Sequence, residues 1–325
     1  MRISTSQMYA QGTANIISGQ SDAYRTQEQL GTGRKILAPR DNPVDSALAL
    51  MTEQAKGVNQ TFMDNQSEAT SRLSFMETQL GSISDLLTSA IERAAQGSNP
   101  DYTALQKQPI SDELKRHFGT LLNIANSTDG TGEYIFSGNS TATKPFVDNA
   151  SAPPPTTIPP TLPNDRSLIN PIIKYVGDDG RHLVQVESTQ TVSTSESGQG
   201  VFMRVTNPDG SLNGRSVFDA LKNMINNLDG VAGAPSAAQN VDDLKNSLGH
   251  ILKVRGNLGA QLNQVESLTT AGNDLSLQFD TRLSKLQGLD YAEAISRFNQ
   301  QTVQLQASQQ SFAKVSQLSL FNLIS

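Results

Sequence analysis

Apolar residues recur at every seventh position over a long stretch near the start of this chain. The line runs without a miss through Leu48, Ala55, Phe62, Ala69, Met76, Ile83 and Ala90. A second line joins it at Leu73, Leu80, Leu87 and Ala94, whereas the polar residues Thr52, Asn59 and Gln66 hold these positions earlier. This period is typical of a long helix that packs along another helix. It predicts one helix that begins at Pro43, after Asn42 as its cap, and ends at the turn of Gly97–Pro100.

A matching line lies in the second half of the sequence. Its members are Leu244, Ile251, Leu258, Val265, Phe279 and Leu286, with Gly272 as the one gap. Because the two lines agree in period and length, we expect the two helices to pair. Shorter helical patterns cover Ser111–Asn126 and Val217–Leu228, and Pro109 either begins the first of these or kinks an extension of it back to Asp101.

Both ends of the chain carry a narrower apolar seam. Tyr9, Ile16, Ala23 and Leu30 follow one another at seven-residue intervals, as do Tyr291, Phe298, Leu305 and Phe312, with Ile295 beside the second line. So narrow a seam does not stabilise an isolated helix, and Gly12, Gly19 and Gly31 each weaken the N-terminal helix by roughly 1 kcal/mol relative to Ala. We therefore expect both terminal helices to be disordered in the monomer and to order on assembly. The predicted assembly interface sets Tyr9, Ile16, Ala23 and Leu30 against Ile295, Phe298, Leu305 and Phe312.

The middle of the chain has a different character. Short β-type runs occur at Tyr134–Phe136, Ile172–Val176 and Leu183–Val186, with a turn at Asp178–Gly180. The predicted fold is mainly α with an inserted β domain. Residues 1–42 and 287–325 form terminal helices, residues 43–130 and 214–286 form a long antiparallel coiled-coil or helical-bundle rod, and residues 131–213 form a small β-rich outer domain. The proline-rich residues 153–163 are expected to be extended, and a mostly irregular lobe is the alternative for the outer domain.

The composition excludes several classes of function. The net charge is −6 and no basic cluster is longer than Arg34–Lys35, which argues against nucleic-acid binding. Cysteine is absent, so no thiol nucleophile, disulfide or Cys-based metal site is possible. His117, His182 and His250 are far apart, and no phosphate or dinucleotide loop is complete. We therefore predict no enzyme activity, no cofactor and no catalytic or metal site.

The export route is also constrained by the sequence. Residues 1–20 lack the apolar core of a secretory signal peptide, and no run of residues approaches transmembrane length. We expect no membrane partner, and export by the general secretory route is not predicted.

Several stretches of the sequence follow the pattern of one known family. They are Met1–Thr5 with Gln7–Met8, Leu30–Lys35 with Arg40–Pro43, Asn123–Gly130 with Tyr134–Gly138, Val254–Leu262, and Ser296–Ser308 with Ser319–Leu323. Together and in this order they resemble the bacterial flagellar hook-associated protein 3 family, the flagellin-like family that forms the hook–filament junction. The first stretch is similar to its start, and the second to its break between terminal and rod domains. Residues 140–213 carry no such motif, so the outer domain is assigned by position.

The resemblance implies an extracellular structural subunit that is exported unfolded through the flagellar type III channel. Its implied partners are further copies of itself in a ring, the first hook-associated protein, flagellin, and a cytoplasmic export chaperone that holds the C-terminal helix. The lean hydrophobic content, 36% of residues, is compatible with a chain that is threaded through a channel and refolded.

Two other interpretations stay open at the level of sequence. The first is a flagellin-type filament subunit, although Tyr134–Gly138 and the ending Phe321–Leu323 favour the junction family. The second is an enzyme or carbohydrate-binding domain on a helical stalk. It would need converging acid and base groups in residues 131–213, where only Asp178, Asp179 and Glu187 are candidates.

Overall fold

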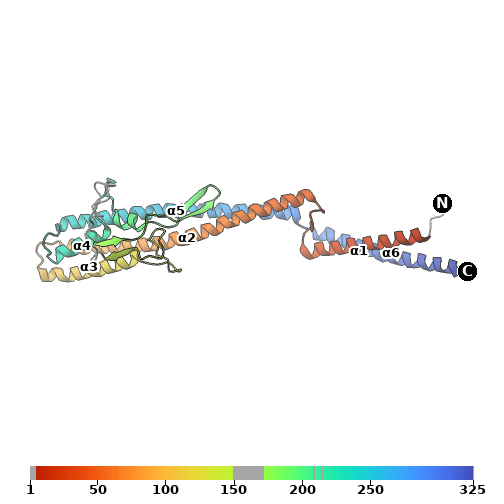
Figure 1. The fold of residues 1–325 in the computed structure, drawn as a ribbon, viewed down its shortest axis with the longest axis horizontal. Coiled ribbons are helices and arrows are strands. Elements are labelled where there is room, and N and C mark those ends of the chain that lie inside the picture. The colour runs from red at the N-terminus through yellow and green to blue at the C-terminus, as the bar shows by residue number, and fades with distance from the viewer. Residues whose placement is uncertain (1–4, 149–171, 208, 214, 325) are drawn as a thin grey trace. The chain divides into compact units, whose positions relative to one another are not determined.

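The computed structural model describes residues 5–148, 172–207, 209–213 and 215–324, and it is dominated by helices (Figure 1). The helices are α1 (Thr5–Thr32), α2 (Pro43–Gly97), α3 (Ala104–Ala125), α4 (Val217–Leu228), α5 (Ala237–Gln287) and α6 (Tyr291–Ile324). The strands are β1 (Phe146–Asp148), β2 (Ile173–Tyr175), β3 (Leu183–Glu187) and β4 (Gln190–Ser193), followed by the π-helix η2 (Gln199–Met203). The mainly helical fold with a small β-containing insertion is therefore confirmed, and the proline-rich residues 153–163 lie outside the described residues.

The chain forms two compact units, residues 1–60 with 273–325 and residues 61–272. The helices α2 and α5 each contribute to both units without a break. The predicted division at residues 42/43 and 286/287 follows the helix ends instead, and it stays a prediction.

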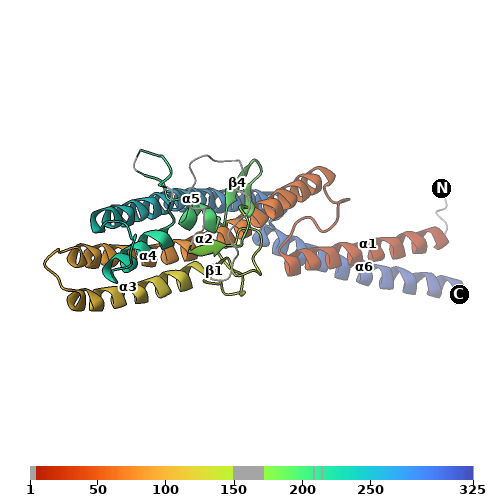
Figure 2. The same cartoon turned by 60° about the vertical axis from the view of Figure 1, so that its left-hand side comes forward.

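In the first unit, α1 and α6 lie side by side and antiparallel (Figure 2).

Asn42 stands just before α2 and caps it. Its Oδ1 accepts a hydrogen bond from the Asp45 backbone N–H at 3.1 Å, and its amide nitrogen donates to the Asp45 carboxylate at 2.7 Å. The predicted Asn42 cap is thus confirmed. Two side-chain contacts join this part of α2 to α5, the ion pair of Lys56 with Asp280 and the hydrogen bond from Gln287 to Glu53 at 3.2 Å.

The apolar line of α2 rotates along the helix. Ala69, Met76, Ile83 and Ala90 are buried, but Ala55 is exposed and Leu48 and Phe62 are only half-buried. Six heptads separate Ala90 from Leu48, and a straight α-helix turns a seven-residue line by about 20° per heptad, or roughly 120° in all. The expectation of one continuous buried line from Leu48 is therefore wrong in its first half. There the polar residues Thr52, Asn59 and Gln66 are buried instead.

The second unit has a wide aromatic core. Phe202 packs against Phe136 and Phe146 with ring centroids 5.1 Å apart in each case, and stacks on Phe218 at 5.6 Å. Phe146 belongs to β1 and Phe218 to α4, so these rings connect the β-containing segment to the helices. Clustered aromatic side chains of this kind contribute strongly to core stability.

Local signals explain where the shorter helices begin. Thr103 and Gln106 form a capping box at the start of α3, and Ser216 and Asp219 form another at the start of α4. Pro109 lies inside α3, which begins at Ala104. Of the two alternatives for Pro109, the helix therefore extends back past it and does not begin at it. At the other end of α3, the Asn126 amide pairs with the backbone of Phe146, donating at 3.0 Å and accepting at 2.9 Å.

Among the described residues, the inserted segment contains two separate two-stranded antiparallel sheets, β1 with β2 and β3 with β4. The predicted run at Ile172–Val176 contains β2, and the run at Leu183–Val186 corresponds to β3, which extends one residue further to Glu187. The strand predicted at Tyr134–Phe136 is wrong. Tyr134 makes an isolated bridge to Thr128, and the segment turns so that Phe136 enters the aromatic core.

Candidate assembly interface

The two terminal seams meet within one chain. Phe312 of α6 lies against Tyr9 of α1, with the ring centroids 5.6 Å apart and the ring planes at 89°. From this contact the seam continues toward the C-terminal end of α1 and the N-terminal end of α6 through half-buried residues, which are Ile16, Ala23 and Leu30 on α1 and Leu305 and Phe298 on α6. The structure therefore brings together seven of the eight predicted interface residues. As a surface between different copies, all eight stay a prediction.

Ile295 is the eighth residue, and it lies half exposed outside this seam. Its neighbour Ala294 is almost fully buried and takes the seam position one turn before Phe298. Within the chain, Ala294 and not Ile295 thus faces α1, because the helical spacing of four residues back from Phe298 reaches Ala294. Ile295 as a residue of the assembly interface stays a prediction. Sequence reasoning missed Ala294 because a lone alanine gives a weak apolar signal.

Glycines of α1 form holes in the seam. A Cβ added to Gly12 would lie 2.6 Å from Cδ2 of Phe312, and one added to Gly19 would lie 3.5 Å from Cδ1 of Leu305. Phe312 and Leu305 of α6 thus pack where α1 has no side chain. The glycines that weaken α1 as an isolated helix therefore allow close approach of α6, and this role was missed in the sequence.

Two polar residues of α1 are also buried. Thr26 donates from Oγ1 to the Asp22 carbonyl at 3.0 Å, and Gln29 donates from Nε2 to the Lys35 carbonyl at 2.7 Å. Thr26 follows Gly12 and Gly19 at seven-residue intervals, and this was the signal in the sequence that could have found it. Gln29 lies outside that series and had no comparable signal.

Backbone hydrogen bonds join the segment that follows α1 to the segment that precedes α6. Lys35 N–H donates to the Gln287 carbonyl at 2.8 Å, and Leu289 N–H donates to the Gly33 carbonyl at 3.1 Å. Gly33 has a φ of +68°, which favours glycine, and a Cβ there would lie 2.8 Å from the Tyr291 hydroxyl.

An ion pair supports the segment that follows. Asp41 accepts hydrogen bonds from the backbone N–H groups of Leu37 and Ala38 and pairs with Arg25 at 2.6 Å. These backbone hydrogen bonds, aided by Arg25, lower the pKa of Asp41. The Asp41 carboxylate is thus bound by backbone N–H groups and a guanidinium of its own chain.

A groove with a volume of about 480 Å³ runs beside the α1–α6 seam. Met8 and Phe312 supply apolar surface, and amide side chains from Gln11, Asn15 and Gln304 surround it. Neutral polar groups lose less hydration on burial than charges do. The groove is therefore suited to contact with another protein chain.

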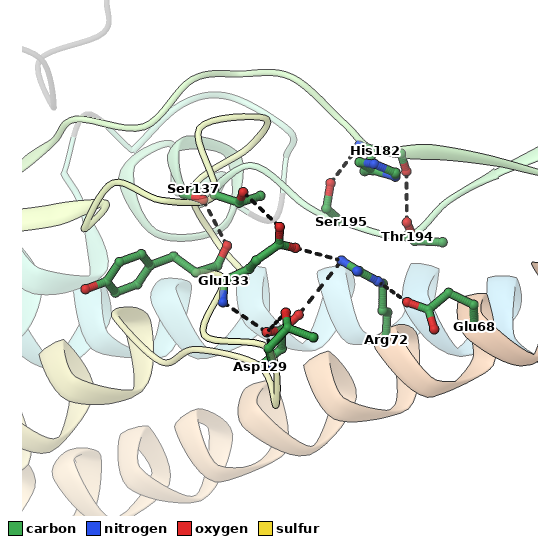
Figure 3. Close-up of polar contacts among 11 residues, drawn as sticks. Glu68, Arg72, Asp129, Glu133, Ser137, His182, Thr194 and Ser195 are labelled. Atoms are coloured by element: carbon green, nitrogen blue, oxygen red, sulfur yellow. Dashed lines mark hydrogen bonds and ion pairs between the residues drawn. The ribbon is translucent and has the colours of Figure 1, made fainter.

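The second unit contains a charged cavity of about 320 Å³. Arg72 of α2 contacts three carboxylates, Glu68 at 2.5 Å, Glu133 at 3.6 Å and Asp129 at 4.0 Å (Figure 3). Burial alone would raise the pKa of Asp129, but hydrogen bonds from Thr131 and the Glu133 backbone, with the charge of Arg72, lower it. A lowered pKa suits an ionised partner of Arg72 and not a general acid. Arg72 thus fastens the segment of Asp129 and Glu133 to α2.

The side chain of Asp178 also binds backbone N–H groups. Its carboxylate accepts from the N–H groups of Asn139 at 2.8 Å and Gly180 at 2.7 Å, and these hydrogen bonds lower its pKa. The predicted turn at Asp178–Gly180 is therefore confirmed. Within the residues that the structure describes, no group of three or more His, Asp or Glu side chains is placed to hold a metal ion.

Two family profiles match the helical ends of the chain. One described as "Bacterial flagellin N-terminal helical region" matches residues 3–141, and one described as "Bacterial flagellin C-terminal helical region" matches residues 238–324. Flagellar hook-associated protein 3 from Escherichia coli (strain K12) is 31% identical over 337 residues, covering 99% of each chain. The chain belongs to the hook-associated protein 3 family. The protein of the same name from Salmonella typhimurium (strain LT2) is 29% identical over the same length and coverage.

The fold of this family is seen in a solved structure of the flagellar junction protein from Legionella pneumophila. It matches with a TM-score of 0.56 at 19% identity, covering 74% of this chain and all of that one. The segments that resemble the hook-associated protein 3 family also hold structural contacts here. Arg255, in the returning helix, donates from Nε to Glu77 of α2 at 3.1 Å.

Proposed function

We propose that this chain is a structural subunit of the bacterial flagellum that forms the junction between hook and filament. The observation that carries the proposal is full-length similarity to two flagellar hook-associated proteins 3, which covers 99% of the chain. In this role the subunit adapts the first hook-associated protein to flagellin through packing of its terminal helices. Relatives of this kind fit a non-enzymatic role.

The geometry of the α1–α6 pair supports assembly through the chain ends. The apolar seam of the pair is narrow, and glycines of α1 leave space in it for side chains of α6. The polar faces carry many amide side chains and few charges. Such a pair gains little stability alone. Neighbouring copies that cover its exposed faces would supply the missing burial, and this supports ordering of both ends on assembly.

The proposed partners are further copies in a ring, the first hook-associated protein, flagellin, and a cytoplasmic export chaperone for the C-terminal helix. Export through the flagellar type III channel to the outside of the cell follows from the same family. Among the described residues, no helix has both the length and the apolar character needed to cross a membrane.

A flagellin-type filament subunit is the second candidate. The named full-length relatives favour the junction protein over it. The two roles differ in extent of assembly, since a filament subunit elongates into fibres when seeded and a junction subunit adds a limited layer.

The decisive experiment is electron microscopy of flagella from a strain that lacks this gene. We expect hooks without filaments, with filament protein released into the medium, and restoration by the gene supplied in trans. Normal filaments on the mutant cells would overturn the junction role. Loss of the hook as well would point to an earlier position in assembly.

A further inference from the structure

The first turns of α2 present an apolar stripe that the described residues leave uncovered. The stripe consists of Val44, Leu48, Met51, Ala55 and Val58, which are spaced four, three, four and three residues apart. Val44, Met51 and Val58 are 67%, 64% and 56% exposed. This spacing is the seam of a coiled coil, and a seam of this kind is complementary to another helix.

Over residues 44–58, the side of α2 that faces inward is mostly polar, and its one buried apolar residue is the small Ala49. Thr52 and Asn59 are buried, and Thr52 Oγ1 donates to the Leu48 carbonyl at 2.7 Å. Lys56 reaches Asp280 of α5 in an ion pair. Apart from Ala49, this segment therefore buries polar residues against its own chain and exposes its large apolar ones, which reverses the usual pattern. A contiguous exposed apolar stripe marks an interaction surface.

A second stripe lies on α1, on the side turned away from α6. It consists of Ala10, Ala14, Ile17, Ser21 and Tyr24, all exposed, with the same spacing of four, three, four and three residues. Ile17 and Tyr24 are 62% and 71% exposed. Neither stripe contains a charged residue, and both span fifteen residues from first to last. Large side chains on α1 alternate with alanine and serine, which provide holes for the leucine and methionine of α2.

We propose that the α1 stripe of one copy packs against the α2 stripe of a second copy. Both stripes belong to the same compact unit, and both are open in the single chain. A contact between two unlike faces of identical subunits is heterologous and continues from copy to copy, closing into a ring or propagating as a helix. The inference rests on the proposed function and names the residues through which copies of the subunit meet.

The size of the stripes sets the strength of the contact. The first and last residues of each stripe are fourteen positions apart, which is about 21 Å along a helix. One such contact buries less than the roughly 800 Å² per partner of a stable interface. Two isolated copies therefore do not stay together. In a ring each copy uses both stripes, and the contacts act jointly.

Cysteine cross-linking tests this pairing on a chain that has no cysteine of its own. The test variant carries Ile17→Cys with Met51→Cys, and the control carries Asp22→Cys with Met51→Cys. Asp22 is exposed on another side of α1. A disulfide forms only where the two Cα atoms approach within about 7 Å. Flagella are isolated from cells that make each variant, oxidised, and analysed on non-reducing gels.

We expect a ladder of disulfide-linked oligomers from the test variant and only monomer from the control variant. Equal cross-linking of both variants, or of neither, with the protein present in the flagella, would overturn the stripe pairing and leave the junction role intact. Absence of both variants and of the wild-type protein from isolated flagella would overturn the junction role and this inference with it.

Opposite charges give an independent test. Ile17→Lys and Met51→Glu should each cause loss of filaments, because each places a charge in an apolar contact. The double variant should regain filaments, since the two charges then face each other. Retention of filaments in both single variants, or no recovery in the double variant, would overturn the pairing.

Discussion

The ring of Phe312 stands edge-on to the ring of Tyr9, with a centroid separation of 5.6 Å and an interplanar angle of 89°. Gly12, one turn after Tyr9, leaves the space into which Phe312 fits. An aromatic pair of this geometry contributes about 0.5–1.5 kcal/mol beyond its buried area. The Phe312 ring thus links α6 to α1 by packing on Tyr9 and by filling the space that Gly12 leaves.

Replacing Gly12 with Ala tests this packing. Helix propensity alone favours Ala by roughly 1 kcal/mol, but the new Cβ would lie 2.6 Å from Phe312 Cδ2. We expect Gly12→Ala to lower the stability of the α1–α6 pair by on the order of 1 kcal/mol, because the ring has to shift. Thermal unfolding followed by circular dichroism measures the change.

Gly57→Ala is the matched control. Gly57 is exposed in α2, and a Cβ there would meet nothing within 4 Å. We expect this change to raise stability by up to about 1 kcal/mol. Stabilisation by both substitutions would show that Phe312 does not fill the space at Gly12.

The long apolar lines allowed much of the fold to be predicted. The helices α2, α4 and α5 lie where the periodic residues stand, and the Asn42 cap starts α2 at Pro43. The seam between α1 and α6 within the chain was also visible in the sequence, because Phe298, Leu305 and Phe312 recur at every seventh residue of α6. Strong periodicity and a capping residue are local signals, and they survive in the folded chain.

Other features depended on geometry that the sequence does not display. The slow rotation of a straight helix relative to a seven-residue line exposed Ala55 and buried Thr52. In the sequence, Gly12 and Gly19 are recognisable only as weak helix formers, because their role in packing depends on the position of α6. Tyr134–Phe136 has a β-type composition, but the aromatic core draws Phe136 inward and bends the segment. Tertiary packing overrides such local preference.

Phe312→Asp is expected to prevent junction assembly. It removes the ring from the seam and places a carboxylate between Tyr9 and Gly12. The unit of residues 61–272 has its own aromatic core, so its folding should be unaffected. Electron microscopy should show hooks without filaments, while urea unfolding of the purified protein retains the main transition. Gln310→Asp, at an exposed position of the same helix, should keep its filaments.

Survival of motility and filaments in Phe312→Asp would contradict the role of this seam. Loss of filaments in Gln310→Asp as well would assign the effect to added charge on α6.

Arg72→Met is expected to lower the free energy of unfolding at pH 7 by about 1 kcal/mol, a typical value for a partly exposed ion-pair network. Arg72 contacts Glu68, Asp129 and Glu133, and methionine keeps most of its length without the charge. The folded-state pKa of Asp129 is lowered, so its stabilisation is present above the ordinary Asp pKa of about 3.9 and is lost as pH falls through the folded value.

The difference between wild type and Arg72→Met should therefore shrink when urea unfolding is repeated near pH 3. Arg93→Met removes an exposed pair with Glu113 and should have a smaller effect at pH 7. A constant difference at both pH values would show that Arg72 acts through packing of its aliphatic part.

His250 is expected to make the second unit sensitive to mild acid. Its Nε2 lies 2.9 Å from the Gly200 carbonyl, to which it donates, and its Nδ1 lies 3.1 Å from Thr206 Oγ1, from which it accepts. Burial is the main cause that lowers the pKa of His250, with a smaller contribution from Lys253. The folded protein therefore holds a neutral imidazole at pH values where the unfolded chain already binds a proton.

The sign of the pH effect follows from this difference. Stability is fully present above the unfolded pKa of about 6.5 and falls as pH drops below it, by at most about 1.4 kcal/mol per pH unit. Burial raises the pKa of Glu196 and Asp243, which act in the opposite direction. Urea unfolding of wild type and His250→Gln at pH 7.5 and 5.5 separates these contributions, since only the histidine differs. We expect the wild type to lose more stability than the variant over this interval, and parallel losses would show that His250 is not the group that titrates.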